Sequence, residues 1–138
     1  ETVIDRDILV MRSTSIEEEA KIIAENDCIA TIGSLSAAEV MDKVSKKLNK
    51  KTKCHLKIDT GMGRYGFLPS EVEKAIKCYD FENLDFCGAY THFSSAFHNA
   101  ELTKVQLEMF KDTIEQIKKS RQKCRYSSCC QFPCLIKC

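Results

Sequence analysis

Residues 57–67 read Lys57-Ile58-Asp59-Thr60-Gly61-Met62-Gly63-Arg64-Tyr65-Gly66-Phe67. Their first three residues end an alternating β-type run over residues 54–59, and this period is typical of a strand. The alternation separates an apolar from a polar set of side chains: Cys54, Leu56 and Ile58 on one face, and His55, Lys57 and Asp59 on the other. Three polar groups on a strand flanked by helices are costly unless they are paired or line a site.

The turn after this strand carries two glycines and an arginine. Gly61 and Gly63 allow positive φ or a close approach of the backbone to a ligand. Arg64 supplies a planar, permanently charged group that suits an oxygen anion. The alternative is an ordinary strand-to-helix connection with a solvated arginine on its surface.

Composition favours one ordinary globular domain. The chain has 138 residues, of which 30% are charged and 43% hydrophobic, with a net charge of +1. This balance gives no indication of a nucleic-acid or membrane partner. No apolar stretch approaches the ~18 residues of a membrane span.

The sequence repeats a strand followed by a helix. The apolar and alternating runs predict strands at residues 7–11, 28–32, 53–59 and 84–91, which gives four βα units. Such units form parallel strands with right-handed crossovers. The fold class is therefore α/β, either an open doubly wound sheet or part of a (β/α)8 barrel. No glycine-rich phosphate fingerprint follows the first strand, which weakens the dinucleotide-binding version of the sheet.

Capping residues and apolar stripes predict the helices. Ser13 or Ser15 can cap the first helix, and Ser36 with Glu39 resembles a capping box for the second. Pro69 opens the third. The fourth spans residues 101–119, and most of its predicted apolar stripe consists of Leu102, Val105, Met109, Ile114 and Ile117.

Functional sites of parallel α/β folds form at the carboxyl ends of the strands. Arg64 follows the third predicted strand and His92 ends the fourth, so topology places both near the same mouth. A histidine there can also be a purely structural hydrogen-bonding group. The glycine turn and Arg64 favour a binding site.

The run from Lys57 to Phe67 closely resembles the signature strand and loop of alanine racemases, which use pyridoxal phosphate. Residues 88–93, Gly-Ala-Tyr-Thr-His-Phe, resemble that family's next strand end, and the resemblance covers about residues 5–120. It implies an internal segment of a TIM-type barrel domain in a cytoplasmic homodimer that acts on a small amino acid. Neither a nucleic acid nor a membrane is expected as a partner.

The resemblance also assigns roles to individual residues. Arg64 matches the arginine that contacts the cofactor's phenolic oxygen and the substrate carboxylate, and His92 matches a histidine near the pyridine ring. Lys57 matches a lysine that many members carry as a carbamate, an anion that would accept hydrogen bonds from Arg64. Asp59 would be a supporting anion, and Gly61 and Gly63 would shape the loop.

Family segments needed for catalysis are missing from this sequence. The cofactor-binding lysine of an early strand, the tyrosine base of a C-terminal domain and an asparagine-serine phosphate turn have no counterpart here. We therefore expect a fragment that neither racemises alanine nor binds the cofactor by itself, with no catalytic residue in this chain. The alternatives are a racemase fragment for another amino acid such as serine, and a non-catalytic half barrel or metal-binding module.

The cysteines fall into two groups. Four lie singly within regular elements, which suits reduced thiols in the cytoplasm. The other five crowd the end of the chain: Cys124, Cys129, Cys130, Cys134 and Cys138. We expect a barrel-like domain over residues 1–120 and an atypical tail over 121–138. Zinc binding, disulfides or out-of-frame sequence would each explain the tail; the spacing argues against a folded zinc site.

Overall fold

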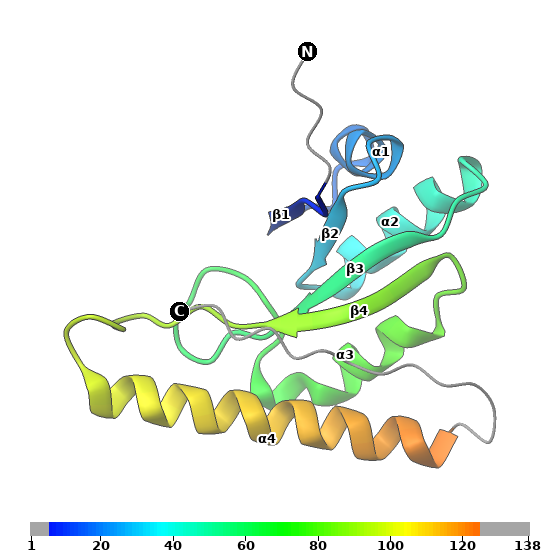
Figure 1. The fold of residues 1–138 in the computed structure, drawn as a ribbon. Coiled ribbons are helices and arrows are strands. Elements are labelled where there is room, and N and C mark those ends of the chain that lie inside the picture. The colour runs from blue at the N-terminus through cyan, green and yellow to red at the C-terminus, as the bar shows by residue number, and fades with distance from the viewer. Residues whose placement is uncertain (1–5, 125–138) are drawn as a thin grey trace.

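The computed structural model describes the backbone of residues 6–124 and the side chains of residues 6–121. Four strands and four α-helices alternate along the chain (Figure 1). The strands are β1 (Leu9–Ser13), β2 (Ile29–Ile32), β3 (Thr52–Lys57) and β4 (Leu84–Tyr90). The helices are α1 (Glu17–Glu25), α2 (Leu35–Lys47), α3 (Val72–Lys77) and α4 (Ala100–Cys124). Two short 3-10 turns, η1 (Pro69–Glu71) and η2 (Cys78–Asp80), flank α3.

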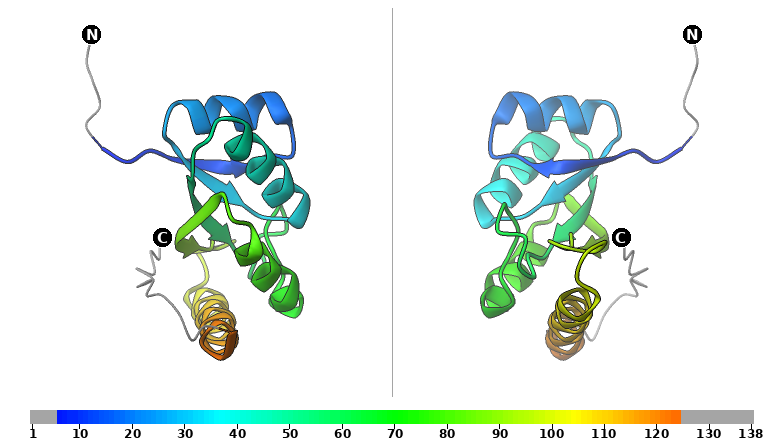
Figure 2. Two further views of the ribbon diagram at one scale, coloured as in Figure 1. Left: turned by 90° about the vertical axis from the view of Figure 1, so that its right-hand side faces the viewer. Right: turned by 90° about the vertical axis from the view of Figure 1, so that its left-hand side faces the viewer.

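The strands form one parallel sheet in the order β1-β2-β3-β4. The prediction of four parallel βα units is therefore confirmed. Figure 2 shows the helices arranged around one side of a twisted sheet, whose other face is turned away from them. Within the described residues, β1 and β4 each have an unpaired outer edge. This is the arrangement expected of part of a (β/α)8 barrel.

The core lies between the sheet and the helices. Ile32, Leu56 and Ile58 point to the helix side and are fully buried. Each such side chain contributes about 1.5–3 kcal/mol through its removal from water. The opposite side chains of β3, His55 and Lys57, face away from the helices, as the alternation predicted.

The strand bounds differ from the predicted ones mainly at β1 and β3. β1 begins and ends two residues later than predicted, and its register with β2 is irregular. β3 ends at Lys57 because the chain then folds back on itself: Asp59 N donates to Phe67 O (2.9 Å) and Phe67 N donates to Lys57 O (2.9 Å).

Two predicted helix caps are wrong. The N-cap of α1 is Ile16, which has no capping side chain. Of the two serines predicted for this role, Ser13 is still in β1, and the hydroxyl of Ser15 bonds Ser36 Oγ (3.1 Å). The N-cap of α2 is Ser34, whose hydroxyl accepts from Ala37 N (3.2 Å), so the helix begins one position before Ser36. Pro69 does open the third helical segment, as η1.

Only two of the five residues predicted for the apolar stripe of α4 are buried. Ile114 and Ile117 are buried, whereas Leu102, Val105 and Met109 are 38–55% exposed. The buried line instead runs through Gln106, Phe110 and Thr113. α4 ends at Cys124, beyond the predicted Lys119, and the other four tail cysteines lie outside the described residues.

Candidate functional site

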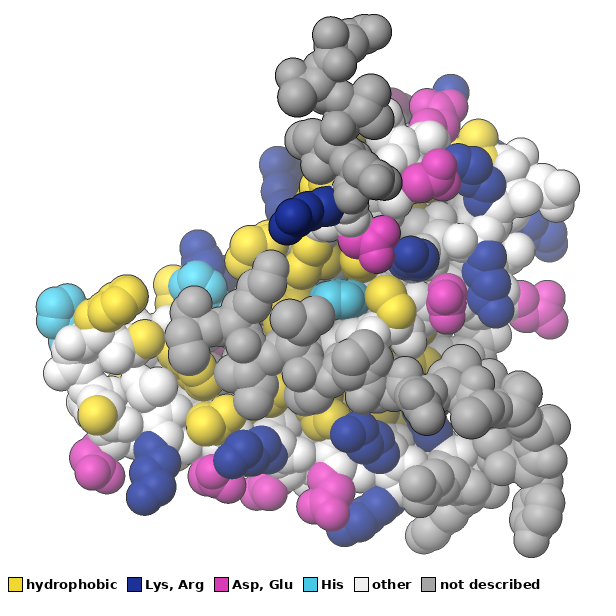
Figure 3. Space-filling view, in the orientation of Figure 1, with side chains coloured by type: hydrophobic (Ala, Val, Ile, Leu, Met, Phe, Trp, Pro, Cys, Tyr) yellow, Lys and Arg dark blue, Asp and Glu magenta, His cyan; other side chains and the backbone are white. Residues whose placement is uncertain are grey.

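The face of the sheet turned away from the helices gathers polar side chains from three strands. His55 and Lys57 of β3 are buried there, beside Thr31 of β2 and Tyr90 of β4. Gly88 lies opposite His55, and a Cβ at this glycine would come within 2.6 Å of His55 Nε2. Gly88 therefore makes room for the imidazole. Figure 3 shows hydrophobic side chains gathered on the same face of the molecule.

The ammonium group of Lys57 lies close to the rings of two tyrosines. Its Nζ donates to Ile58 O (2.8 Å) and lies 5.6 Å and 5.7 Å from the ring centroids of Tyr65 and Tyr90. Burial lowers the pKa of Lys57; the charge of Asp59 opposes this shift and the charge of Arg64 adds to it. Lys57 thus faces the polar side of the sheet and not a helix. Its modification as a carbamate stays a prediction.

Asp59 organises the loop that follows β3. Its Oδ1 accepts from the backbone N–H groups of Gly61 (2.9 Å), Met62 (2.8 Å) and Gly63 (3.2 Å), and its Oδ2 accepts from Gly63 as well (2.9 Å). Burial by itself would raise the pKa of Asp59, but these N–H groups lower it to a net value below the ordinary one. The carboxylate is therefore a structural anion that fixes the glycine turn.

The backbone of the loop needs its glycines. Gly61 and Gly63 have φ of 134° and 72°, so the positive φ anticipated for them is present. Sequence reasoning missed Gly66, which has φ of 120° and where a Cβ would lie 2.9 Å from Lys57 Cγ and 3.0 Å from Lys57 O. The loop closes over Lys57 at this point.

Arg64 lies on the exposed part of this loop. Among the described residues it makes no hydrogen bond or ion pair, so its guanidinium is available to an anionic ligand. The bonds to Asp59 and the closure at Phe67 fix the backbone on either side of it. An accessible arginine on a loop that is hydrogen-bonded on both sides of it can bind a carboxylate or phenolate oxygen in a defined orientation.

His92 follows β4 at the carboxyl ends of the strands, as the Arg64 loop follows β3. The hydroxyls of Thr60 and Thr91 share a buried hydrogen bond (2.8 Å) that joins the ends of β3 and β4. A hollow of about 360 Å³ next to them is lined by Met62, His92 and residues 93–98. The structure thus brings the Arg64 loop, through Met62, to the half-buried His92.

Gln106 of α4 contacts the loop after β3 and the loop after β4. It is buried, its Oε1 accepts from Ser94 N (3.1 Å) and its Nε2 donates to Ser94 Oγ (3.1 Å). A Cβ at Gly61 would lie 2.6 Å from the same Nε2. This residue explains why the buried line of α4 begins with a polar side chain.

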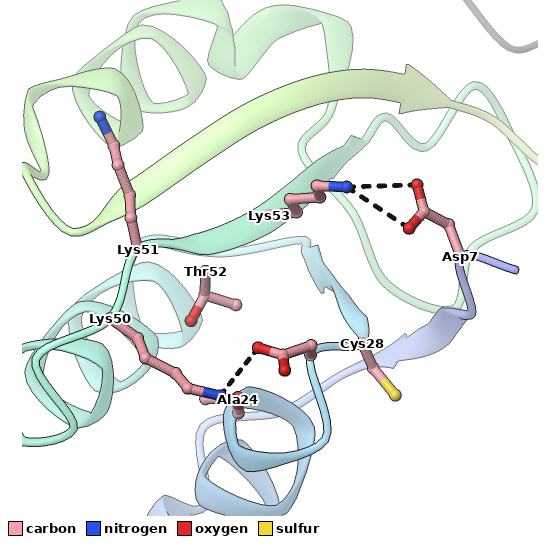
Figure 4. Close-up of a pocket in the computed structure, with 8 residues that line it drawn as sticks. Asp7, Ala24, Cys28, Lys50, Lys51, Thr52 and Lys53 are labelled. Carbon is pink, nitrogen blue, oxygen red and sulfur yellow. Dashed lines mark hydrogen bonds and ion pairs between the residues drawn. The ribbon is translucent and has the colours of Figure 1, made fainter. Parts of the chain in front are cut away.

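A second hollow, of about 270 Å³, lies at the opposite end of the sheet (Figure 4). Two ion pairs cross it, Lys50 Nζ to Asp27 Oδ1 (2.8 Å) and Lys53 Nζ to Asp7 Oδ2 (3.3 Å). Exposed pairs of this kind contribute about 0–1 kcal/mol each. They link the loops at the amino ends of the strands, where barrels carry stability and not chemistry.

Four cysteines whose side chains the structure describes, Cys28, Cys54, Cys78 and Cys87, are free thiols. Burial raises the pKa of Cys78 to about 12. No cluster of metal-binding side chains occurs within the part of the chain that the structure describes. None of its helices has the length and apolar character needed to cross a membrane.

The fold and this edge of the sheet define a segment of a parallel (β/α)8 barrel with its site at the carboxyl ends of the strands. Residues 1–136 match the alanine racemase N-terminal domain, and this chain belongs to that family. The alanine racemase of Methanococcus maripaludis is 42% identical over 99 residues, which are 70% of this chain and 26% of that protein.

Solved structures agree with this assignment. The alanine racemase of Clostridium difficile 630 is 30% identical, with a TM-score of 0.79 over 86% of this chain and 31% of that one. The enzyme of Bartonella henselae, solved with covalently bound pyridoxal phosphate, shares the fold at 24% identity and a TM-score of 0.68 over 83% of this chain and 34% of that one. The chain thus spans about a quarter to a third of the relatives it matches.

Proposed function

We infer that this chain supplies the Arg64 and His92 wall of the active site of a pyridoxal phosphate-dependent amino-acid racemase. The observation that carries this inference is Arg64 itself. It is an accessible guanidinium on a loop fixed by Asp59, and Met62 of the same loop lines a hollow together with His92. In this role Arg64 binds the substrate carboxylate and the phenolic oxygen of the cofactor, and His92 packs near the pyridine ring.

The described residues fit part of the cofactor's requirements. The free donors of Arg64 suit its oxygen anions. Lys57 does not suit its covalent attachment, because its side chain is 2% exposed and its Nζ already donates to Ile58 O. When bound, pyridoxal phosphate takes up the electron pair left by the α-proton. This chain contributes orientation and charge, and we expect it to be inactive on its own.

Lys57 has the chemistry for carbamate formation. A lysine whose pKa is lowered by burial has more neutral amine, which adds to carbon dioxide and releases one proton. The product is an anion near Arg64, so it would accept hydrogen bonds from the guanidinium and hold it in place. Asp59 cannot do this as well, since its oxygens already accept backbone N–H groups.

Alanine is the proposed substrate, with serine as the alternative within the same class of enzyme. A cytoplasmic location and a homodimer belong to the same proposal. The histidine racemase of Leuconostoc mesenteroides has the same fold at 21% identity and a TM-score of 0.67. The fold therefore does not select the substrate, and an assay has to compare several amino acids.

A chimera tests the proposal. Residues 6–119 of this chain replace the aligned segment of the Methanococcus maripaludis alanine racemase, and interconversion of D- and L-alanine is measured beside that of serine. We expect alanine racemisation. A folded chimera that binds pyridoxal phosphate but racemises neither amino acid would contradict the proposed function.

A further inference from the structure

Tyr65, the residue after Arg64, ties the loop to the far side of the sheet. Its hydroxyl donates to Met11 O in β1. The contact joins residues 54 positions apart, because the loop crosses from the end of β3 back over the carboxyl end of β1. The sequence reasoning singled out Arg64 but gave no role to its neighbour.

The acceptor lies in an irregular part of β1. Leu9 pairs with Ile29 and Ser13 pairs with Thr31, so three residues of β1 stand against a single residue of β2. Bulges of this kind leave backbone groups outside the regular ladder and are frequent next to functional sites. Here side-chain hydroxyls donate to the carbonyls: Thr31 Oγ1 to Val10 O (2.7 Å), and Tyr90 OH to Met11 O (2.8 Å).

These hydroxyls form one connected cluster. Thr31 Oγ1 and Tyr90 OH lie 3.0 Å apart, and Met11 O accepts from both tyrosines. The cluster therefore joins β1, β2, β4 and the loop, and the Lys57 ammonium lies 5.6 Å and 5.7 Å from the centroids of the two tyrosine rings. The hydrogen bond from Tyr65 to this cluster restrains the chain just after Arg64, whereas Asp59 restrains the chain before it.

We propose that Tyr65 is a positioning residue. The hydrogen bond from its hydroxyl to the carbonyl of Met11, in the irregular part of β1, fixes the backbone next to Arg64. Asp59 holds the loop before Arg64 and Tyr65 holds it after, so the guanidinium leaves a backbone anchored on both sides. What Arg64 binds rests on the proposed function. The order of the loop does not.

The test is Tyr65→Phe in this chain, which removes the hydroxyl and keeps the ring over Lys57. The matched control is Tyr79→Phe, since Tyr79 packs against Phe86 (4.5 Å between centroids), away from the loop. Amide hydrogen exchange is measured for residues 61–66 and for β3. Loss of one net hydrogen bond predicts roughly fivefold faster exchange in the loop of Tyr65→Phe. β3 and the control stay unchanged.

A second readout separates positioning from general stability. NMR titration of 13C-labelled Lys57 should show its pKa moving up towards the ordinary lysine value in Tyr65→Phe only, because a looser loop admits water. Unchanged loop exchange in Tyr65→Phe would overturn the proposal, and so would an equal acceleration throughout the chain. If the chimera is inactive and Tyr65→Phe loosens the loop of this chain, the two results together count against the proposed function and leave this inference standing.

Discussion

At the scale of single residues, the site depends on which charges are already satisfied. Asp59 and Arg64 are five positions apart on one loop, yet the carboxylate accepts from backbone N–H groups and leaves the guanidinium free. A direct ion pair between them would have neutralised the arginine. Because the N–H groups around Asp59 satisfy the carboxylate, the donors of Arg64 stay available to the ligand that we propose for it.

Asp59→Asn tests this arrangement. The amide oxygen cannot replace a charged acceptor of three N–H groups, so we expect a loss of about 1.5–3 kcal/mol in the free energy of unfolding at neutral pH. Because folding lowers the pKa of Asp59 below 3.8, its contribution is complete above that pH and disappears as the pH falls through the folded-state value.

Urea unfolding of the wild type and Asp59→Asn, followed from neutral pH down to acid, measures this effect. The stability difference between them should shrink in acid. The control is Asp112→Asn on the exposed face of α4. An equal loss at every pH would show that the charge of Asp59 does not stabilise the loop.

At the level of helices and strands, sequence periodicity correctly predicted the strands and the side chains of β3 that face the helices. The alternation of residues 54–58 and the apolar runs gave all four strands in parallel order, because burial on the helix side fixes the face. The predicted cap of α2 was wrong because serines at positions 34 and 36 both suit an N-cap. In the folded chain Ser34 caps the helix, and Ser36 Oγ bonds Ser15 Oγ (3.1 Å).

The same limit explains α4. Its sequence offers apolar residues on more than one face, and the pattern does not show that Gln106 turns inwards to hold Ser94. The sequence pattern singled out Asp59 and Arg64 beside the glycine turn, and in the structure Asp59 holds that turn. The ligand-binding role of Arg64 stays a prediction. Tyr65 and Gly66 acquire their roles from contacts that only the folded loop creates.

Two alanine substitutions on α4 separate the observed from the predicted stripe. Phe110→Ala should cost about 3–5 kcal/mol in the free energy of unfolding, since Phe110 is fully buried. Val105→Ala should change it by no more than about 0.5 kcal/mol, since Val105 is 55% exposed. Urea denaturation measures both. Similar losses in the two variants would mean that α4 buries the face predicted from its apolar residues.

At the scale of the whole molecule, the described region is a four-stranded parallel segment of a barrel. The loop of Arg64 and His92 both lie at the carboxyl ends of its strands, whereas Lys57 at the end of β3 is buried. The roles that we propose for Arg64 and His92 are therefore binding and orientation, and covalent attachment of the cofactor is not proposed for Lys57.

The shielding of Lys57 predicts the outcome of a labelling experiment. After incubation with pyridoxal phosphate and reduction with borohydride, peptide mapping of this chain should find no single stoichiometric pyridoxyl-lysine, because Lys57 is shielded and engaged with Ile58 O. The Bartonella henselae alanine racemase, which carries the covalent cofactor, is the positive control. Stoichiometric label on one lysine of this chain would refute the prediction.

We propose Arg64 as the anion-binding residue of the site, and kcat/KM for alanine in the chimera measures that role. Arg64→Lys keeps the charge and loses the planar fork, so we predict a loss of roughly 10- to 150-fold. Arg12→Lys, at an exposed arginine paired with Glu19 on α1, should leave the rate unchanged. An Arg64→Lys chimera as active as its parent would contradict the account.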